Sequence, residues 1–197
     1  MKILNFFPTE SKSQKEPQLS LMADSSLLKD GKPFYIPDFD TQFTARPAMM
    51  VQICRLGKNI APKFAHRYYN AVGVAVCVTA QTLFESLKSR NEPTDLATSF
   101  DGAAILSNLK TIEEPHVIDA ETRFNIKVND TIVWNFQVSE SNVAIDNLIS
   151  NVSRYFTLKI GDYILIGIPN MESITLYRDM HITATINGES ILSMHVK

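Results

Sequence analysis

Few side chains in this sequence have the chemistry of a nucleophile or a metal ligand, and they are scattered along the chain. Its histidines are His66, His116, His181 and His195, and their spacing is not that of a metal site. Cys54 and Cys77 are 23 residues apart, which matches neither a zinc knuckle nor a disulfide framework. The chain has only seven glycines and no Gly-x-Gly-x-x-Gly or phosphate-loop pattern. We therefore expect no zinc cluster and no nucleotide-phosphate loop.

Length and composition indicate one ordinary globular domain. The chain has 197 residues, of which 45% are hydrophobic and 20% charged. Its net charge of −2 gives no electrostatic reason to expect nucleic acid or a membrane surface as a partner. No apolar run approaches the ~20 residues of a membrane span, and the N-terminal apolar run is too short for a signal peptide. The sequence therefore predicts a cytoplasmic protein.

The first half of the chain shows two apolar runs that predict buried strands, at residues 49–54 and 72–79. Residues 63–70 predict a short helix. Thr79 is a candidate cap for a helix that ends near Arg90. The polar residues 9–20 predict a loop or arm.

The second half predicts two hairpins, one helix and one further strand. Residues 123–138 read as two strands around an Asn129-Asp130 turn, and His181–Ile186 pairs with 190–196 across Asn187-Gly188. Apolar residues at helical spacing predict a helix over 145–156. Residues 163–168 predict a strand. The elements do not alternate as strand, helix, strand, so the expected class is α+β with an antiparallel or mixed sheet.

Four segments in the same order resemble the fumarylacetoacetate hydrolase family, C-terminal-domain type. They are residues 55–60 (Arg-Leu-Gly-Lys-Asn-Ile), 64–69 (Phe-Ala-His-Arg-Tyr-Tyr), 100–102 (Phe-Asp-Gly) and 156–162 (Phe-Thr-Leu-Lys-Ile-Gly-Asp). The resemblance covers the chain from about Ser25 to its C-terminus. It implies a single domain of rolled, mixed β-sheets with a few helices, and a homodimer. Family members use Mg²⁺ or Mn²⁺ to act on acylpyruvate-like keto or enol acids.

The resemblance also implies where the metal ligands would be, and this sequence departs from the family there. The family's Glu-x-Glu pair falls at Arg46 and Ala48, and its metal-binding aspartate falls at Cys77. Mg²⁺ prefers hard oxygen ligands, which none of these side chains supplies. A permanent cation at Arg46 would repel a metal ion. We therefore expect no metal cofactor and name no catalytic residue.

Other family site positions have changed as well. The catalytic lysine of the family falls at Thr98, and the arginine of its Thr-Ala-Arg-Asp run falls at Gln81. The two hydroxyl residues of its Thr-Gly-Thr-Pro loop become Ile166 and Ile168. Asp101 remains as an acid close to the expected site. These positions, with Arg46, Ala48 and Cys77, are the predicted remnants of the family pocket.

Each remnant has a functional and a plain interpretation. Arg46 could clamp a carboxylate through its planar guanidinium, or form a salt bridge or be solvated. Cys77 could be a reactive thiol beside Arg46, or a small buried residue. Asp101 could contact a ligand, or only hold a turn. His66 could be a base, but packing or surface exposure is the simpler reading.

The leading hypothesis is a family member that has lost metal-dependent catalysis and keeps a binding or structural role. It would have an N-terminal arm at 1–24, a family domain at 25–197 and a homodimeric assembly. One alternative is an active hydrolase, isomerase or decarboxylase of acylpyruvate-like acids. The other is a protein that binds small dicarboxylate anions.

Overall fold

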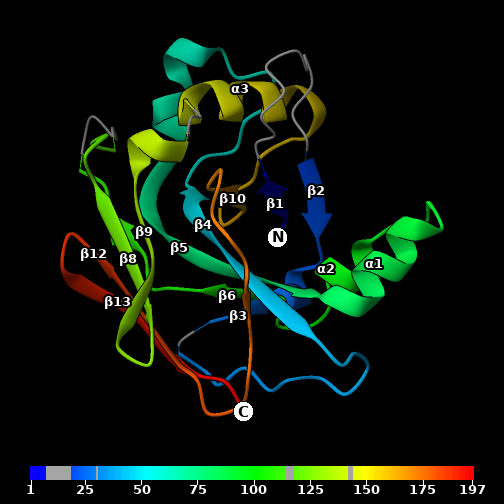
Figure 1. Ribbon diagram of the computed structural model, residues 1–197. Coiled ribbons are helices and arrows are strands. Elements are labelled where there is room, and N and C mark those ends of the chain that lie inside the picture. The colour runs from blue at the N-terminus through cyan, green and yellow to red at the C-terminus, as the bar shows by residue number, and fades with distance from the viewer. Residues whose placement is uncertain (8–18, 30, 114–117, 142–143) are drawn as a thin grey trace.

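The computed structural model describes residues 1–7, 19–29, 31–113, 118–141 and 144–197 (Figure 1). Thirteen strands form two curved sheets in this part of the chain. The strands are β1 (Ile3–Phe6), β2 (Leu19–Met22), β3 (Leu27–Leu28), β4 (Phe43–Ile53), β5 (Tyr69–Ala80), β6 (Ala104–Leu106), β7 (Lys110–Thr111), β8 (Arg123–Val128), β9 (Thr131–Gln137), β10 (Tyr163–Gly167), β11 (Ile174–Thr175), β12 (His181–Ile186) and β13 (Glu189–His195). The α-helices are α1 (Gln81–Ser89), α2 (Asp95–Thr98) and α3 (Ile145–Tyr155).

The larger sheet has nine strands, with the order β2-β1-β10-β4-β5-β6-β3; β11 pairs with β4, and β7 pairs with β5. The pairs β1–β10 and β3–β6 are parallel, whereas β4 and β5 are antiparallel. The smaller sheet has the order β13-β12-β8-β9. Figure 1 shows α3 across one end of the larger sheet and α1 with α2 beside the other. This arrangement confirms the predicted α+β class with rolled, mixed sheets.

The long pair β4–β5 is the centre of the larger sheet. Its register runs from Phe43 opposite Ala80 to Ile53 opposite Tyr69, so both strands extend beyond the predicted apolar runs. Because side chains alternate along a strand, the pair has two different faces. We call one the core face; it carries Met49 and Val74, with Ile166 of the neighbouring β10, into the main hydrophobic cluster. We call the other the site face; it carries Ala48, Ala75 and Cys77 in a separate, smaller cluster.

The predicted helices formed, but the cap proposed for the first one is wrong. Thr79 is still part of β5, and α1 begins after Ala80, which makes no side-chain cap. Asp40 serves instead, because its Oδ2 accepts a hydrogen bond from the Leu83 amide at 2.9 Å. The cap therefore comes from a residue 43 positions away, which local spacing could not reveal. Helix α3 covers the predicted stretch, and the short helix predicted near residue 63 is a 3₁₀ segment, η2 (Pro62–Tyr68).

Both predicted hairpins are present, and their turns explain why. Asn129 and Asp130 have φ of 47° and 67°, and Asn187 and Gly188 have φ of 49° and 86°. Two successive residues with positive φ give the turn that matches the twist of paired strands. The first hairpin joins β8 to β9, and the second joins β12 to β13. The smaller sheet is therefore built from these two hairpins, paired through β12 and β8.

Residues before position 25 contribute two strands to the larger sheet. Strand β1 pairs with β10 and β2. It is tied down by Asp162, whose carboxylate accepts a hydrogen bond from the Lys2 amide and forms an ion pair with the Lys2 ammonium at 2.6 Å. Most of the loop predicted at 9–20 lies outside the described residues, since positions 8–18 are not described.

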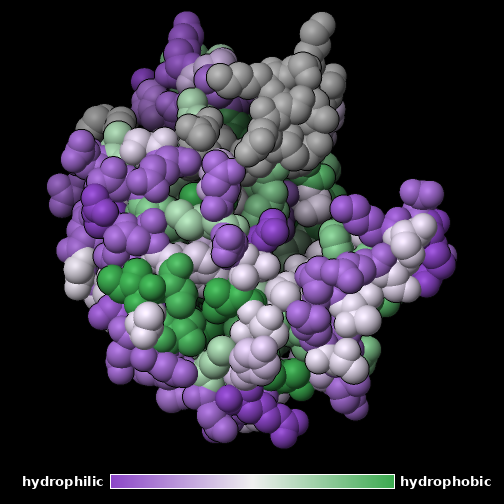
Figure 2. All heavy atoms as spheres, in the orientation of Figure 1, coloured by the Kyte–Doolittle hydropathy of each residue, from purple (hydrophilic) through white to green (hydrophobic). Residues whose placement is uncertain are grey.

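The surface in Figure 2 is mostly polar, with one apolar area over the smaller sheet. Among the described residues, no helix has the length and apolar character needed to cross a membrane.

Candidate functional site

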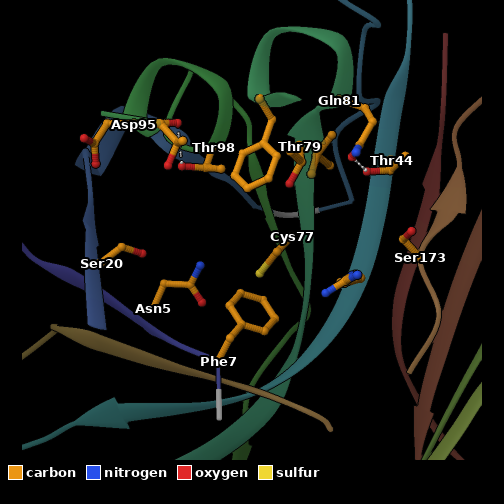
Figure 3. Close-up of a pocket in the computed structure, with 14 residues that line it drawn as sticks. Asn5, Phe7, Ser20, Thr44, Cys77, Thr79, Gln81, Asp95, Thr98 and Ser173 are labelled. Atoms are coloured by element: carbon orange, nitrogen blue, oxygen red, sulfur yellow. Dashed lines mark hydrogen bonds between the residues drawn. The ribbon is translucent and has the colours of Figure 1, made fainter. Parts of the chain in front are cut away.

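A cavity of about 390 Å³ lies over the site face of the larger sheet. Its described lining comes from strands β1, β2, β4 and β5, helices α1 and α2, and the segment before β11. The lining residues are Asn5, Phe7, Ser20, Thr44, Arg46, Cys77, Val78, Thr79, Gln81, Phe84, Thr94, Asp95, Thr98 and Ser173. Figure 3 shows Cys77 and Phe7 near the middle, with polar side chains to either side. The volume suits a small ligand, since such pockets start at about 300 Å³.

Arg46 is the cation of this lining. It is directly opposite Cys77 in the β4–β5 register, so the two predicted remnants share one row of the site face. The side chain is exposed, and within the described residues its guanidinium has no hydrogen-bond or ion-pair partner. The described residues therefore do not form the salt bridge that was one of the interpretations of Arg46. A free guanidinium at a cavity wall is available to a carboxylate.

Cys77 forms part of the cavity floor and is 7% exposed. Burial raises the pKa of its thiol to about 12, because the thiolate would lose its hydration. At neutral pH the thiol is therefore protonated, and the neighbouring Arg46 does not activate it. This geometry favours the plain interpretation of Cys77 as a small buried residue.

The residues expected at the family's metal positions do not fit Mg²⁺ or Mn²⁺. These positions hold a guanidinium at Arg46, a methyl group at Ala48 in the next row of the site face and a protonated thiol at Cys77. In the described part of the chain, no three Asp, Glu, His or Cys side chains come close enough to share an ion. These metals require several oxygen ligands, which these positions cannot supply. His116 lies outside the described residues, and His181 stacks on His195 in the smaller sheet, away from this lining.

Gln81 and Thr98 line the cavity as predicted, but their polar side-chain atoms already form hydrogen bonds within the protein. Gln81 Oε1 accepts a hydrogen bond from the Thr44 hydroxyl at 3.0 Å, and its Nε2 donates to Glu85 at 2.7 Å. The Thr98 hydroxyl donates to the carbonyl of Thr94 at 3.2 Å. These contacts fix the walls of the cavity.

The other predicted remnants are not part of the described lining. Ala48 is fully buried between Gly167 and Ala75, its register partners on either side. Ile166 and Ile168 belong to the core face, because they alternate with Gly167 along the chain. Asp101 is exposed in the turn that Gly102 closes with a φ of 82°.

Sequence reasoning missed Asn5, the most unusual residue of the lining. It is 7% exposed, and its Oδ1 is buried without a hydrogen-bond partner. A buried amide oxygen left unpaired costs about 1–3 kcal/mol, so this atom is a local cost to the fold. The available signal was an asparagine inside the apolar run 3–7. Phe7 was also missed; its ring lies where a side chain at Gly167 would be, 2.0 Å from an added Cβ.

Comparisons with known proteins agree with this architecture. A sequence profile described as fumarylacetoacetate (FAA) hydrolase C-terminal matches residues 5–196. The oxaloacetate tautomerase FAHD1, mitochondrial, of Rattus norvegicus is 27% identical over 185 residues, which is 92% of this chain and 80% of that protein. The oxaloacetate tautomerase YcgM of Escherichia coli K12 is 24% identical over 177 residues, which is 90% of this chain and 80% of that protein.

Two solved structures show the same fold at low identity. Fumarylpyruvate hydrolase from Pseudomonas aeruginosa, in complex with Mn²⁺ and pyruvate, superposes with a TM-score of 0.82 at 14% identity, covering 100% of this chain and 89% of that one. The 5-carboxymethyl-2-hydroxymuconate delta-isomerase from Mycobacterium smegmatis gives 0.80 at 16% identity, covering 99% and 78%. The profile match spans nearly the whole chain and the fold agrees throughout, so this chain belongs to the fumarylacetoacetate hydrolase family.

Proposed function

We propose that this chain has lost the metal-dependent catalysis of its family and binds a small carboxylate through Arg46. The observation that carries the proposal is the position of Arg46, opposite Cys77 in the row where the resemblance leads us to expect the family's metal. A guanidinium and a divalent cation both attract a carboxylate, but only the metal ion can act as a Lewis acid. The exchange therefore keeps binding and removes the group on which the family's reactions depend.

The surroundings of Arg46 support a binding role over a purely structural one. The cavity is open, and the guanidinium is unpaired among the described residues. In a family member with a purely structural role, we would expect side chains to occupy the space of this cavity. The names of the relatives point to carboxylic acids, since two are oxaloacetate tautomerases and one structure holds pyruvate.

Isothermal titration calorimetry tests the loss of the metal. We expect no binding of Mg²⁺ or Mn²⁺ at micromolar concentration, and carboxylate binding that EDTA does not change. One metal ion per chain at micromolar affinity would overturn the proposal.

A variant series tests the role of Arg46. Arg46→Ala should abolish carboxylate binding, and Arg46→Lys should weaken it, because an ammonium cannot form the bidentate pair. Arg178→Ala is the matched control, since Arg178 is exposed and outside the cavity lining. Carboxylate binding that survives Arg46→Ala unchanged would contradict the proposed function.

The alternative is an active enzyme, which the names of the curated relatives favour. An oxaloacetate tautomerase assay, followed by the ultraviolet absorbance of the enol, separates the two. We expect the rate with this protein to equal the rate in buffer, with or without Mn²⁺. Turnover that EDTA abolishes would establish the active alternative and remove the leading proposal.

The homodimer and the cytoplasmic location remain predictions. Light scattering after size exclusion should give about twice the chain mass of 22.1 kDa if the dimer forms. A fluorescent fusion would locate the protein, and this is informative because the relative from rat is named as mitochondrial.

A further inference from the structure

The cavity has two chemically different ends, and we infer that its ligand is an aminocarboxylate whose ammonium and carboxylate are separated by a short carbon chain. This inference rests on the proposed function, because Arg46 would hold the carboxylate. It adds the class of the ligand, which differs from a dicarboxylate.

One end of the cavity presents a negative charge and neutral polar groups. Asn5 and Ser20 are directly opposite each other in the β1–β2 register, and both line the cavity. Asp95, in the first turn of α2, adds an exposed carboxylate. Figure 3 shows Asn5, Ser20 and Asp95 on the same side of Cys77. The Asp95 carboxylate favours a ligand group that donates hydrogen bonds and carries positive charge, and the Ser20 hydroxyl can accept a hydrogen bond from such a group.

The opposite end presents donors and the positive charge. Arg46 lies between Thr44 and Ala48 on β4, and the pairing of Ile174 with Ala45 brings the neighbouring Ser173 to the same place. Figure 3 shows Thr44 and Ser173 on the far side of Cys77 from Asn5. The Arg46 guanidinium therefore lines the end of the cavity that is remote from Asp95. A ligand carboxylate would be held at this Arg46 end.

The register sets the distance between the two ends. Asn5 on β1 pairs with Leu165 on β10, which in turn pairs with Met50 on β4. Arg46 is four residues from Met50 along β4, and β4 is two strands away from β1. On a flat sheet this places the two backbone positions about 16 Å apart, from about 3.3 Å per residue and about 4.8 Å between strands. The long Arg46 side chain shortens the gap but does not close it. A ligand that reaches both ends needs several carbon atoms between its charges.

The middle of the cavity suits such a chain. Cys77, with its protonated thiol, and the ring of Phe7 lie between the two ends (Figure 3). Neither group carries charge, so both favour methylene groups over polar atoms. A dicarboxylate would place its second carboxylate near Asp95, whose negative charge would repel it.

The test compares ligands that differ only in their end groups, using the full chain and calorimetry. The series is butyrate, glutarate, glycine, γ-aminobutyrate and ε-aminocaproate. We expect γ-aminobutyrate or ε-aminocaproate to bind about tenfold tighter than butyrate or glutarate, as one additional charge-assisted hydrogen bond provides. Glycine should bind no better than butyrate, because it cannot reach both ends.

Variants of the Asp95 end sharpen the test. Asp95→Asn should weaken γ-aminobutyrate about fivefold and strengthen glutarate, since it removes both an attraction and a repulsion. Ser20→Ala should weaken the aminocarboxylates only, since it removes the hydroxyl that accepts a hydrogen bond from the ammonium, and a melting curve without ligand checks that this variant folds. Asp101→Asn is the control, because Asp101 is exposed and outside the cavity lining.

The outcomes separate this inference from the proposed function. If glutarate binds more tightly than both longer aminocarboxylates, or if Asp95→Asn affects all ligands equally, the inference is wrong and carboxylate binding stands. If no member of the series binds, both the inference and the proposed function are wrong.

Discussion

Two neighbouring rows of the larger sheet differ in almost every respect except their backbone. On the core face, Ile166, Met49 and Val74 lie side by side across β10, β4 and β5, and all are fully buried. One residue farther along, on the site face, the row reads Gly167, Ala48 and Ala75. Large side chains make up the first row and small ones the second, where the Phe7 ring covers Gly167.

The contrast shows how one sheet can provide both stability and a binding surface. The core face is packed in the main cluster, where the loss of a few carbon atoms creates a void. The site face borders a cavity at Arg46 and Cys77, so side chains there can change with less effect on the fold. Arg46 and Cys77, where the resemblance leads us to expect metal ligands of the family, both lie at this cavity.

The largest expected effect compares truncations on the two faces. Ile166→Ala should lower the free energy of unfolding by about 2–5 kcal/mol, because it leaves a cavity in the core face. Cys77→Ala, on the site face, should cost about 1 kcal/mol or less, since a cavity already adjoins the thiol. Urea denaturation measures both. Equal losses would show that the two faces do not differ in packing.

The second prediction concerns the two cysteines. With its pKa raised to about 12, Cys77 should react with a disulfide reagent about a thousandfold more slowly at neutral pH than a thiol of ordinary pKa near 9. Burial also raises the pKa of Cys54, but that thiol is only partly buried and should react first. Mass spectrometry of the labelled peptides identifies each site. Fast labelling of native Cys77 would mean that the site face opens, or that Arg46 activates the thiol.

The third prediction uses the contact between Phe7 and Gly167. Gly167→Ala should destabilise the protein by about 1–3 kcal/mol, because the new methyl group needs the space of the Phe7 ring. The double variant Phe7→Ala, Gly167→Ala should show a smaller additional loss than the two single changes predict. A double-mutant cycle in thermal unfolding measures this coupling. Strict additivity would indicate that the ring does not rest on Gly167.

The smallest expected effect concerns Asp40, which caps α1 and so positions the cavity wall at Gln81. Burial raises the pKa of the Asp40 carboxyl, but hydrogen bonds from Leu83, Thr82, Thr41 and Gln42 outweigh it, so the pKa lies below its usual value.

Asp40→Ala should therefore cost about 0.5–2 kcal/mol at neutral pH. Because the folded-state pKa is lowered, this contribution is present above the ordinary pKa and is lost as the pH falls through the lowered value, below about pH 4. Unfolding at pH 7 and pH 3 measures it, with the exposed neighbour variant Asp38→Ala as control. A cost that stays constant with pH would rule out the charged cap.

Local patterns determined much of the fold, because they act through neighbouring residues. Apolar runs predicted the C-terminal half of β4 and most of β5, helical spacing predicted α3, and Asn129-Asp130 and Asn187-Gly188 predicted both hairpins. The ordered segments between residues 55 and 162 identified the family, and the profile match confirmed it. The same alignment located Arg46, Cys77, Gln81 and Thr98, which the structure brings to one cavity.

Only the tertiary structure decided which residues make the ends of that cavity. Asn5, Ser20 and Asp95 come from three separate elements, and no spacing along the chain relates them to Arg46. The cap of α1 by Asp40 is equally remote in sequence. Side-chain alternation placed Ile166 and Ile168 on the core face, and the order of strands placed β1 and β2 beside the site. Strand order and face depend on pairing between distant segments, so they became visible only when the sheet was assembled.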